Sequence, residues 1–211
     1  MFTWGPRSSS SGPAAIEWVA GADSANGAIS VIIPIPAHAA NDLIVAWAHG
    51  LPASTPALPS GWTNILFRAF SATGNATRLY CIRDTGNTIN TLTLPSGTND
   101  LGFLIYRNAS GAGVAAIVDP DALGPNSGAT QSLGSLTAGS WVVAGIDINQ
   151  GSTITDPTGL THRILRDVAI GGGTGSVVDT NGIVPSYAGG DVFTWGTGAF
   201  YSTFAFEILN G

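Results

Sequence analysis

Short runs of apolar or alternating residues recur along the whole chain, and turn-forming residues separate them about every ten positions. Thr77–Ile82 alternates polar and apolar residues and ends at Asp84-Thr85-Gly86, as a half-buried antiparallel strand does before a turn. No window of a dozen residues keeps an apolar period of 3.6. The pattern therefore predicts an all-β protein. The predicted strands are Ala28–Ile35, Asp42–His49, Trp62–Phe70, Thr77–Arg83, Ile89–Leu94, Gly102–Tyr106, Ala115–Val118, Ser140–Ile148, Leu160–Arg166, Val177–Thr180 and Tyr201–Leu209.

One part of this pattern occurs twice. The segment 41–68 aligns without gaps with the segment 139–166, 98 residues later. In both, an apolar strand and a polar loop precede a Pro-x-Gly turn and a second strand, and Pro59-x-Gly61 matches Pro157-x-Gly159. Proline fixes φ and glycine allows a positive φ, so this tripeptide reverses the chain rigidly. Two interpretations stay open: an internal duplication, or two unrelated β-arches that need the same turn chemistry.

These strands predict a single antiparallel β-sandwich of jelly-roll or concanavalin-like type, with a pseudo-duplicated interior as one option. A shorter echo links Phe2-Thr3-Trp4-Gly5 to Phe193-Thr194-Trp195-Gly196. Between the first of these and the sandwich, the Ser-rich stretch 7–13 has the composition of a flexible linker. We therefore expect an N-terminal arm over residues 1–13 and one sandwich domain over residues 14–211.

Charge is scarce and unevenly distributed among residue types. The 211 residues include 9% charged residues, seven Arg and no Lys, and the net charge is -6. Such a chain lacks the basic surface of a nucleic-acid-binding protein, and it is poorly suited to anionic membranes. We expect neither a signal peptide at the N-terminus nor membrane insertion, because no apolar run approaches the length of a transmembrane helix.

The residues that could carry catalysis or bind metal show no productive spacing. His38, His49 and His162 form no paired ligand motif, and no serine completes a nucleophile elbow. The aspartates lie mostly in turn-forming contexts, where they bond their own backbone. Asp119-Pro120-Asp121 offers oxygen ligands for a structural Ca²⁺ without a complete loop motif. The lone Cys81 is expected to be a buried hydrophobe. We therefore predict no catalytic residue, metal site or cofactor.

Aromatic residues are the better candidates for contacts with other molecules. Trp47, Trp62 and Trp141 lie in or beside predicted strands and are expected in the core. Five aromatic residues in segments rich in Gly, Pro and Ser are less clearly part of the core. These candidate assembly residues are Phe2, Trp4, Trp18, Tyr187 and Trp195. They could insert into a partner subunit, or stack on the sugar rings of a glycan.

The segment Asn41-Asp42-Leu43-Ile44-Val45-Ala46, followed by Leu58-Pro59-Ser60-Gly61-Trp62-Thr63, resembles a β-sandwich domain of virion structural proteins in tailed bacteriophages. The resemblance extends over roughly residues 28–209, through the strand ends at Ile82-Arg83 and Tyr106-Arg107-Asn108 and through Gly139–Ala144. This chain departs from it at Asn41 and Asn108, where the family often carries glycine. The resemblance implies a structural protein and lends no catalytic residues.

The low charge and the resemblance together predict a non-enzymatic virion protein. The expected role is an exterior capsid decoration or a tail accessory subunit that binds major capsid or tail proteins and associates with its own copies. Such a protein is made in the host cytoplasm and ends up in the virion. The alternative is a carbohydrate-binding adhesin domain that recognises a host surface glycan.

Overall fold

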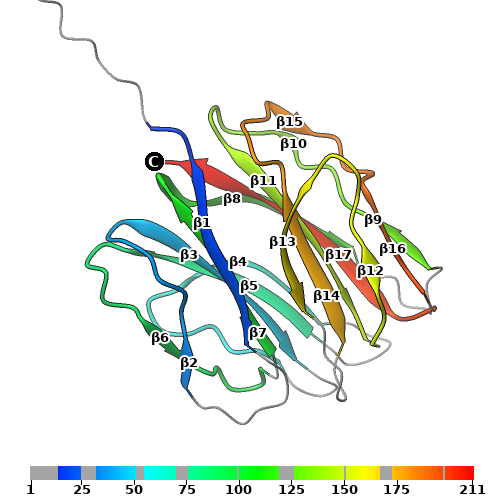
Figure 1. Ribbon diagram of the computed structural model, residues 1–211, viewed down its shortest axis with the longest axis horizontal. Coiled ribbons are helices and arrows are strands. Elements are labelled where there is room, and N and C mark those ends of the chain that lie inside the picture. The colour runs from blue at the N-terminus through cyan, green and yellow to red at the C-terminus, as the bar shows by residue number, and fades with distance from the viewer. Residues whose placement is uncertain are drawn as a thin grey trace, which may run out of the picture.

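The chain folds into antiparallel sheets, shown as a computed structural model in Figure 1. The structure describes residues 14–24, 32–50, 55–69, 76–98, 100–118, 126–149, 151–166, 173–196 and 198–211. Two sheets have five strands each. The first contains, in spatial order, β1 (Glu17–Ser24), β7 (Asp100–Arg107), β3 (Asp42–Gly50), β5 (Ala76–Asp84) and β4 (Thr63–Ala69). The second contains β8 (Ala109–Val118), β17 (Tyr201–Asn210), β11 (Trp141–Ile148), β14 (Thr174–Asp179) and β13 (Thr161–Arg166).

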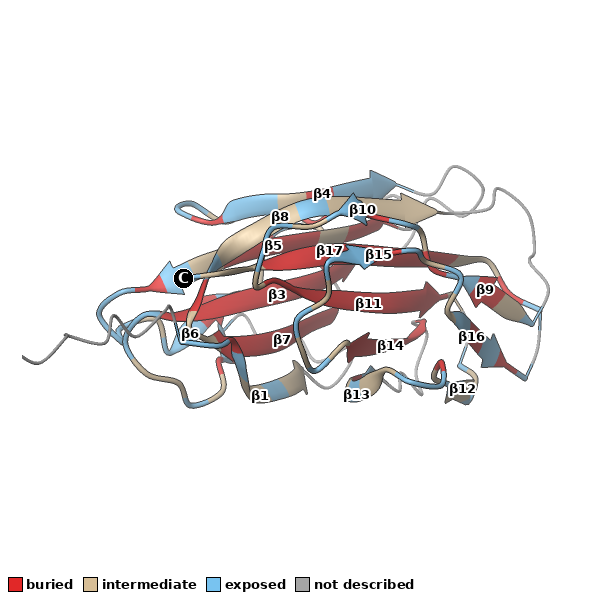
Figure 2. Cartoon of the chain, turned by 90° about the horizontal axis from the view of Figure 1, so that it is seen from above, coloured by how far each residue is buried: buried red, intermediate tan, exposed pale blue. Residues whose placement is uncertain are grey.

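Smaller sheets cover the outer faces of these two. Outside the first sheet lies the pair β2 (Ile32–Pro34) and β6 (Thr91–Thr93). Outside the second lie β9 (Ser127–Ala129), β16 (Val192–Trp195) and β12 (Ile154–Thr155), together with the pair β10 (Gly134–Ser135) and β15 (Ser186–Tyr187). Both large sheets are therefore covered on both faces, and their central strands are buried throughout (Figure 2).

The two halves of the chain repeat one topology. In chain order, β1 to β7 of the first half correspond to β8, β9, β11, β13, β14, β16 and β17 of the second, and each large sheet has the same spatial order. The second and sixth strands of each unit pair with each other outside the large sheet, an arrangement of jelly-roll type. The sequence repeat between 41–68 and 139–166 is thus part of a repeat that spans both sheets.

Irregularities of the strands repeat as well. The β4–β5 register shifts between Asn64 and Leu66, and the β13–β14 register shifts between His162 and Ile164, at the matching position. The turn glycines Gly61 and Gly159 have φ of 83° and 92°. A shared turn chemistry alone would not reproduce a bulge, so the structure favours the internal duplication over two unrelated arches.

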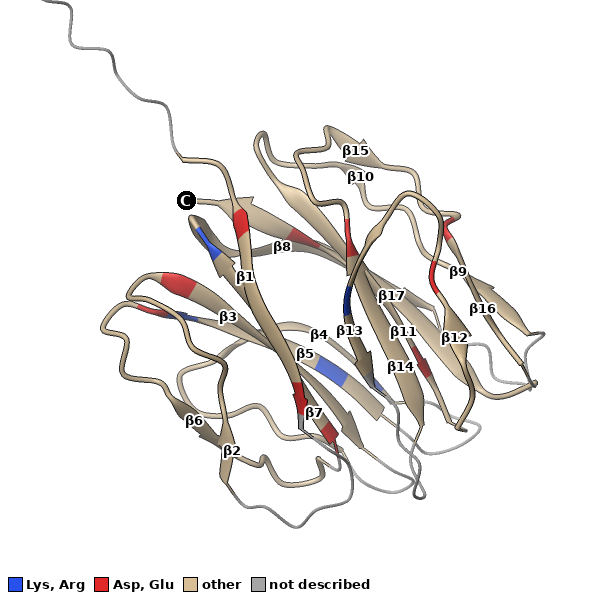
Figure 3. Cartoon of the chain, in the orientation of Figure 1, with Lys and Arg blue, Asp and Glu red and all other residues tan. Residues whose placement is uncertain are grey.

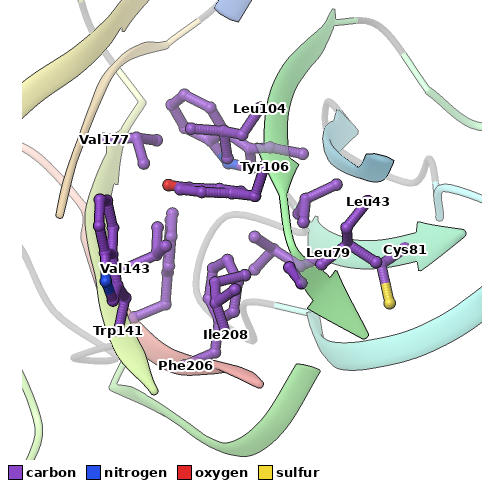
Figure 4. Packing of buried hydrophobic residues seen from close by; sticks show 14 of the residues in the cluster. Leu43, Leu79, Cys81, Leu104, Tyr106, Trp141, Val143, Val177, Phe206 and Ile208 are labelled. Carbon is purple, nitrogen blue, oxygen red and sulfur yellow. The ribbon is translucent and has the colours of Figure 1, made fainter. Parts of the chain in front are cut away.

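Three apolar clusters form between the layers. The central cluster lies between the two large sheets and takes side chains from both, including Val45, Tyr106, Val143 and Phe206 (Figure 4). The residues between them in sequence point the other way, so that Ile44 and its neighbours fill the outer cluster of the first half. Phe193 and its neighbours fill that of the second. This use of both faces explains why β3 and β11 read as nearly continuous apolar runs.

Large and small residues exchange places between the repeats at the central interface. Trp47 corresponds to Gly145, and Phe204 corresponds to Gly102, because each pair occupies the same register position in its sheet. A methyl group on Gly145 would overlap the ring of Phe204, and one on Gly175 would overlap the indole of Trp47. Gly175 thus lets the second sheet approach the Trp47 ring of the first, whereas Gly145 makes room for Phe204 beside it in the same sheet.

A buried carboxylate links the two sheets at the same place. Asp147 of β11 accepts a hydrogen bond from Trp47 Nε1 at 2.9 Å and one from Thr77 Oγ1 at 2.6 Å. Both donors belong to the first sheet, and all three residues are buried. Hydrogen bonds to a buried charge are directional, so this carboxylate fixes how the sheets are aligned.

The prediction of an antiparallel all-β fold is confirmed, and no described residue is helical. The predicted single sandwich is extended, because the pseudo-duplicated interior produces two large sheets with additional layers outside them. Sequence analysis predicted the outer strands β2 and β6 within Ala28–Ile35 and Ile89–Leu94, but not β1, the first half of β8 or the short outer strands of the second half. These strands contain small residues, and their conformation comes from pairing with a neighbour.

We predict that Gly145→Ala lowers the free energy of unfolding by about 2–3 kcal/mol, because the added methyl group overpacks Phe204. Urea unfolding followed by circular dichroism measures the change. Gly111→Ala is the matched control, since a methyl group there meets nothing within 4 Å. Equal stability of both variants would contradict the packing described above.

Candidate partner-binding site

The edges of the two large sheets meet along two seams. One lies between β1 and β13, and the other between β4 and β8 (Figure 2). The repeat relates these seams to each other, because β1 corresponds to β8 and β13 corresponds to β4. We call the β1/β13 edge the closed seam and the β4/β8 edge the open seam, for the reasons that follow.

The closed seam is filled by an indole and a guanidinium. Trp18 contacts Tyr106 edge to face, with ring centroids 5.5 Å apart, and the Arg163 guanidinium lies 4.7 Å from the Trp18 ring centroid. Asp179, fully buried, accepts hydrogen bonds from Arg163 Nε at 2.7 Å and from the Tyr106 hydroxyl at 3.1 Å. Burial, followed by the neighbouring Asp179, raises the pKa of Tyr106 well above its usual value. The hydroxyl therefore remains a donor.

The open seam carries small or apolar residues at the matching positions. The matching positions follow from the strand registers. In the first half, Trp18 lies opposite Tyr106, which lies opposite Leu43. In the second half, Ala112 lies opposite Ile208, which lies opposite Trp141. Ala112 thus takes the place of Trp18. By the same register, Ile65 takes the place of Arg163 and Cys81 that of Asp179. Neither an indole nor an ion pair fills this edge.

A pocket of about 310 Å³ lies beside β8 at the open seam. Its lining combines the apolar Leu43, Cys81 and Ala112 with the polar Thr63, Arg83 and Ser110. Burial raises the pKa of the Cys81 thiol to about 11, against the weaker opposite effect of a hydrogen bond with the Ala112 backbone. The thiol is therefore uncharged at neutral pH, and this wall of the pocket is apolar. The prediction that Cys81 is a buried hydrophobe is confirmed, since its exposed fraction is 4%.

A second pocket of about 230 Å³ adjoins the first and shares Arg83 with it. Arg107 closes one wall, because its Nε and Nη2 donate to the buried Asp42 carboxylate at 3.1 and 3.0 Å. Asn41 and Asn108 have φ of 71° and 57°, in the left-handed region. Asparagine adopts this region more readily than other residues with a side chain, so it can hold both turns.

The sheet end behind this second pocket is held by a buried ion pair. His38 Nδ1 lies 2.8 Å from the Pro36 carbonyl oxygen, and Nε2 lies 3.0 Å from Asp84 Oδ2. Both partners are acceptors, so both ring nitrogens carry hydrogen and His38 is charged. Although burial lowers the pKa of His38, these bonds raise it above 6.5 overall.

Asp84 also holds the turn that follows β5. Its carboxylate accepts hydrogen bonds from the backbone N–H groups of Gly86, Thr88 and Ile89. Burial alone would raise the pKa of Asp84, but the bond from His38 and these three bonds lower it to about 2. This carboxylate stays ionised and acts as a structural anchor.

Charge distinguishes β8 from the other edge strands. β1 contains Glu17 and Asp23, β4 contains Arg68, and β13 contains Arg163. β8, with ten residues, contains no charged side chain. Charged side chains on an edge strand discourage pairing with another protein, so β8 is the least protected of the four edges (Figure 3).

The three predicted assembly residues that the structure describes are not gathered in one place. Trp18 fills the closed seam, whereas Tyr187 and Trp195 are 7% and 5% exposed within the outer cluster of the second half. Phe2 and Trp4 lie outside the described residues. Contact of any of the five with a partner stays a prediction, and the buried rings of Tyr187 and Trp195 leave little surface for it.

Sequence analysis did not single out Ala112, Cys81 and Leu43 as neighbours at one site. The available signal was the uncharged run of small residues over 109–116, which breaks the usual composition of an edge strand. The correspondence between Trp18 and Ala112 could not be seen, because β1 and β8 share no motif.

Comparison with protein families, with curated proteins and with solved structures finds no match to this chain. Within the described ranges, no helix is long and apolar enough to cross a membrane. The same ranges hold no group of three or more His, Cys, Asp or Glu side chains placed to bind a metal. The possible Ca²⁺ ligands Asp119 and Asp121 lie outside the described residues.

We predict that His38→Ala costs about 2 kcal/mol of stability at pH 5.5 and clearly less at pH 9. The raised pKa of His38 means that its contribution is complete below about 6.5 and is lost as pH rises through the folded-state value. The lowered pKa of Asp84 sets the lower pH limit of this stabilisation, because the contribution of Asp84 is lost only as pH falls from about 3.8 through about 2.

Urea unfolding at the two pH values measures this difference. His162→Ala is the control, because His162 also lies 2.6 Å from a carboxylate but its side chain is 48% exposed. Exposed pairs contribute little, so this variant should be nearly neutral at both values. A loss of stability in His38→Ala that is the same at both pH values would contradict the charged pair.

Proposed function

We propose that this chain is a non-catalytic structural subunit of a tailed-bacteriophage virion that binds neighbouring subunits through the open seam. Its place is the exterior of the head, as a decoration protein, or an accessory part of the tail. The single observation that carries the proposal is the seam itself: β8 is an uncharged edge strand, and a pocket lies beside it.

The physical argument starts from the cost of desolvation. Burying a charged group against a partner is expensive, whereas small uncharged residues lose little hydration and allow close approach of the two backbones. All ten residues of β8 are uncharged and seven of them are Ala, Ser or Gly, and the strand has one backbone edge unpaired in its sheet. On β4, Phe67 adds a ring that is 38% exposed. This surface is therefore better suited to burial against a permanently bound subunit than to contact with water.

The placement of the carboxylates supports a structural role. Six of them are almost completely buried among the described residues: Asp42, Asp84, Asp100, Asp147, Asp179 and Glu207. Asp84 anchors a turn, and Asp147 and Asp179 hold donors from the opposite sheet. Their chemistry serves the fold, and their burial leaves the exterior with still less charge than the composition indicates.

The resemblance of residues 28–209 to virion β-sandwich domains supports the phage assignment, and the two asparagine turns at Asn41 and Asn108 remove the main departure from it. The alternative, a glycan-binding adhesin, needs several exposed aromatic side chains in line. The candidates Tyr187 and Trp195 are buried, so this function has less support.

We predict that Val114→Lys on β8 abolishes or strongly weakens self-association, because it places a charge on the unprotected edge. Sedimentation velocity over a range of concentrations measures the effect. Leu165→Lys on β13 is the matched control, since Val114 and Leu165 are each 48% exposed. Loss of association in both variants, or in neither, would argue against the open seam as the contact.

Particles purified from the phage or induced prophage that carries this gene test the virion assignment. Quantitative mass spectrometry should find the chain in them. A copy number that scales with the capsid subunits indicates decoration of the head, and a small fixed number indicates the tail. Absence from particles, or glycan-array binding that depends on exposed rings, would overturn the assignment.

A further inference from the structure

Two pockets of different character meet at Arg83. The pocket of about 230 Å³ has two guanidinium groups in its wall, those of Arg83 and Arg107. The pocket of about 310 Å³ shares Arg83 and has the apolar side chains of Leu43, Ile82 and Ala112 in its wall. Arg83 therefore lies between a cationic compartment and a partly apolar one.

The Arg83 guanidinium has N–H groups available for a ligand. Its side chain is exposed, and its Nε donates to the Asn41 carbonyl oxygen at 3.3 Å. Among the described residues, no carboxylate forms an ion pair with Arg83, and no acceptor takes a hydrogen bond from its two Nη groups. These two groups together carry four N–H donors in one plane.

Arg107 adds a second guanidinium that is held in place by the fold. Its Nε and Nη2 donate to the two oxygens of Asp42 at 3.1 and 3.0 Å, and its side chain is 42% exposed. Asp42 itself is buried and also accepts a bond from the Ala39 N–H at 2.8 Å. The pocket is therefore lined by accessible cationic groups, while the compensating carboxylate lies behind them.

The other acidic groups at this end of the sheet leave the charge of Arg83 uncompensated. Asp84 is buried and paired with His38 at 3.0 Å. Glu17 is exposed and lies opposite Arg107 in the register of β1 and β7. β1 is three strands away from β5, which carries Arg83, a distance of about 14 Å. This exceeds the screening length of about 10 Å at 0.1 M salt.

The larger pocket provides a place for an uncharged chain. No described residue in its lining is acidic. Burial raises the pKa of the Cys81 thiol to about 11, so that this group is uncharged at neutral pH. An apolar chain that enters the pocket gains from leaving water without having to displace a charged group other than Arg83.

We propose that the two pockets form a binding site for an aliphatic carboxylate. Its carboxylate group lies on the guanidinium groups of Arg83 and Arg107, because a planar fork of N–H donors matches the two oxygens of a carboxylate. Its chain lies in the larger pocket, beside Leu43 and Ala112. The inference goes beyond the proposed subunit role, because the chemistry of the site is the same whether or not the chain belongs to a virion.

Two sources can supply this group. One is a free carboxylic acid. The other is an acidic side chain of a second copy, since the chain has 13 acidic residues against seven arginines and a net charge of -6. Both present the same carboxylate on an aliphatic stem, and the experiments below distinguish them.

Titration of the isotope-labelled full-length chain with hexanoate, followed by nuclear magnetic resonance at neutral pH, tests the site. We expect saturable shifts of the backbone N–H signals of residues 110–112. Acetate keeps the carboxylate without the chain, and hexanamide keeps the chain without the charge. Each should bind at least about tenfold more weakly than hexanoate.

Arg83→Gln should weaken hexanoate binding at least about tenfold, because it removes the charged fork. Arg68→Gln is the matched control, since Arg68 is also exposed and lies outside the described lining of both pockets. It is opposite Thr77, six residues from Arg83 along β5 and thus about 20 Å away. This variant should bind hexanoate as the unmodified chain does. Circular dichroism establishes that both variants are folded, and hexanamide tests the same contact without a substitution.

Equal binding of hexanoate and hexanamide, or of hexanoate and acetate, overturns the proposal. Unchanged binding by Arg83→Gln does so as well. Equal weakening in Arg68→Gln would reveal an effect of overall charge and would also overturn it. Absence of the chain from virions would overturn the phage assignment and would leave this binding result unaffected.

Sedimentation velocity distinguishes the two sources of the carboxylate. If a second copy supplies it, Arg83→Gln and an excess of hexanoate each dissociate the oligomer of the unmodified chain, and acetate does not. If association persists under both conditions, or if the unmodified chain is monomeric, the ligand is a free carboxylic acid.

Discussion

The structure depends on close contact between two sheets that are each covered on both faces. Trp47 of the first sheet packs over Gly175 of the second, and its indole N–H bonds the buried Asp147. The ring needs a glycine opposite it, and the carboxylate needs donors from the other sheet. These requirements hold the sheets at one distance and in one alignment, so every other feature, including both seams, is positioned by this interface.

The repeat explains why the interface is asymmetric. Two identical halves would place two large rings, or two glycines, at positions related by the repeat. Instead, Trp47 corresponds to Gly145 and Phe204 to Gly102, and the Trp47 ring fills the space that Gly175 of the other half leaves open. Side chains of complementary size at matching positions fill the interior without strain. Two large rings there would be overpacked, and two glycines would leave a void.

The same divergence distinguishes the two seams in their side chains. Trp18, Arg163 and Asp179 complete one edge within the chain, whereas Ala112, Ile65 and Cys81 leave the matching edge incomplete. An incomplete edge next to an uncharged strand is a liability for an isolated monomer and an advantage for a subunit of an assembly. Among the edge strands of the two large sheets, the scarcity of charged residues is thus most marked on β8.

The amino-acid sequence by itself determined the all-β class, most of the strands in the two large sheets, and the matching Pro-x-Gly turns, because these follow from local periodicity and turn chemistry. It also contained the repeat between 41–68 and 139–166. Only the tertiary structure decided that the repeat spans both sheets, that Asp147 bonds Trp47, and that Ala112 occupies the counterpart of Trp18's position. These facts depend on which strands become neighbours across the interface, and residues some hundred positions apart carry no local signal of that contact.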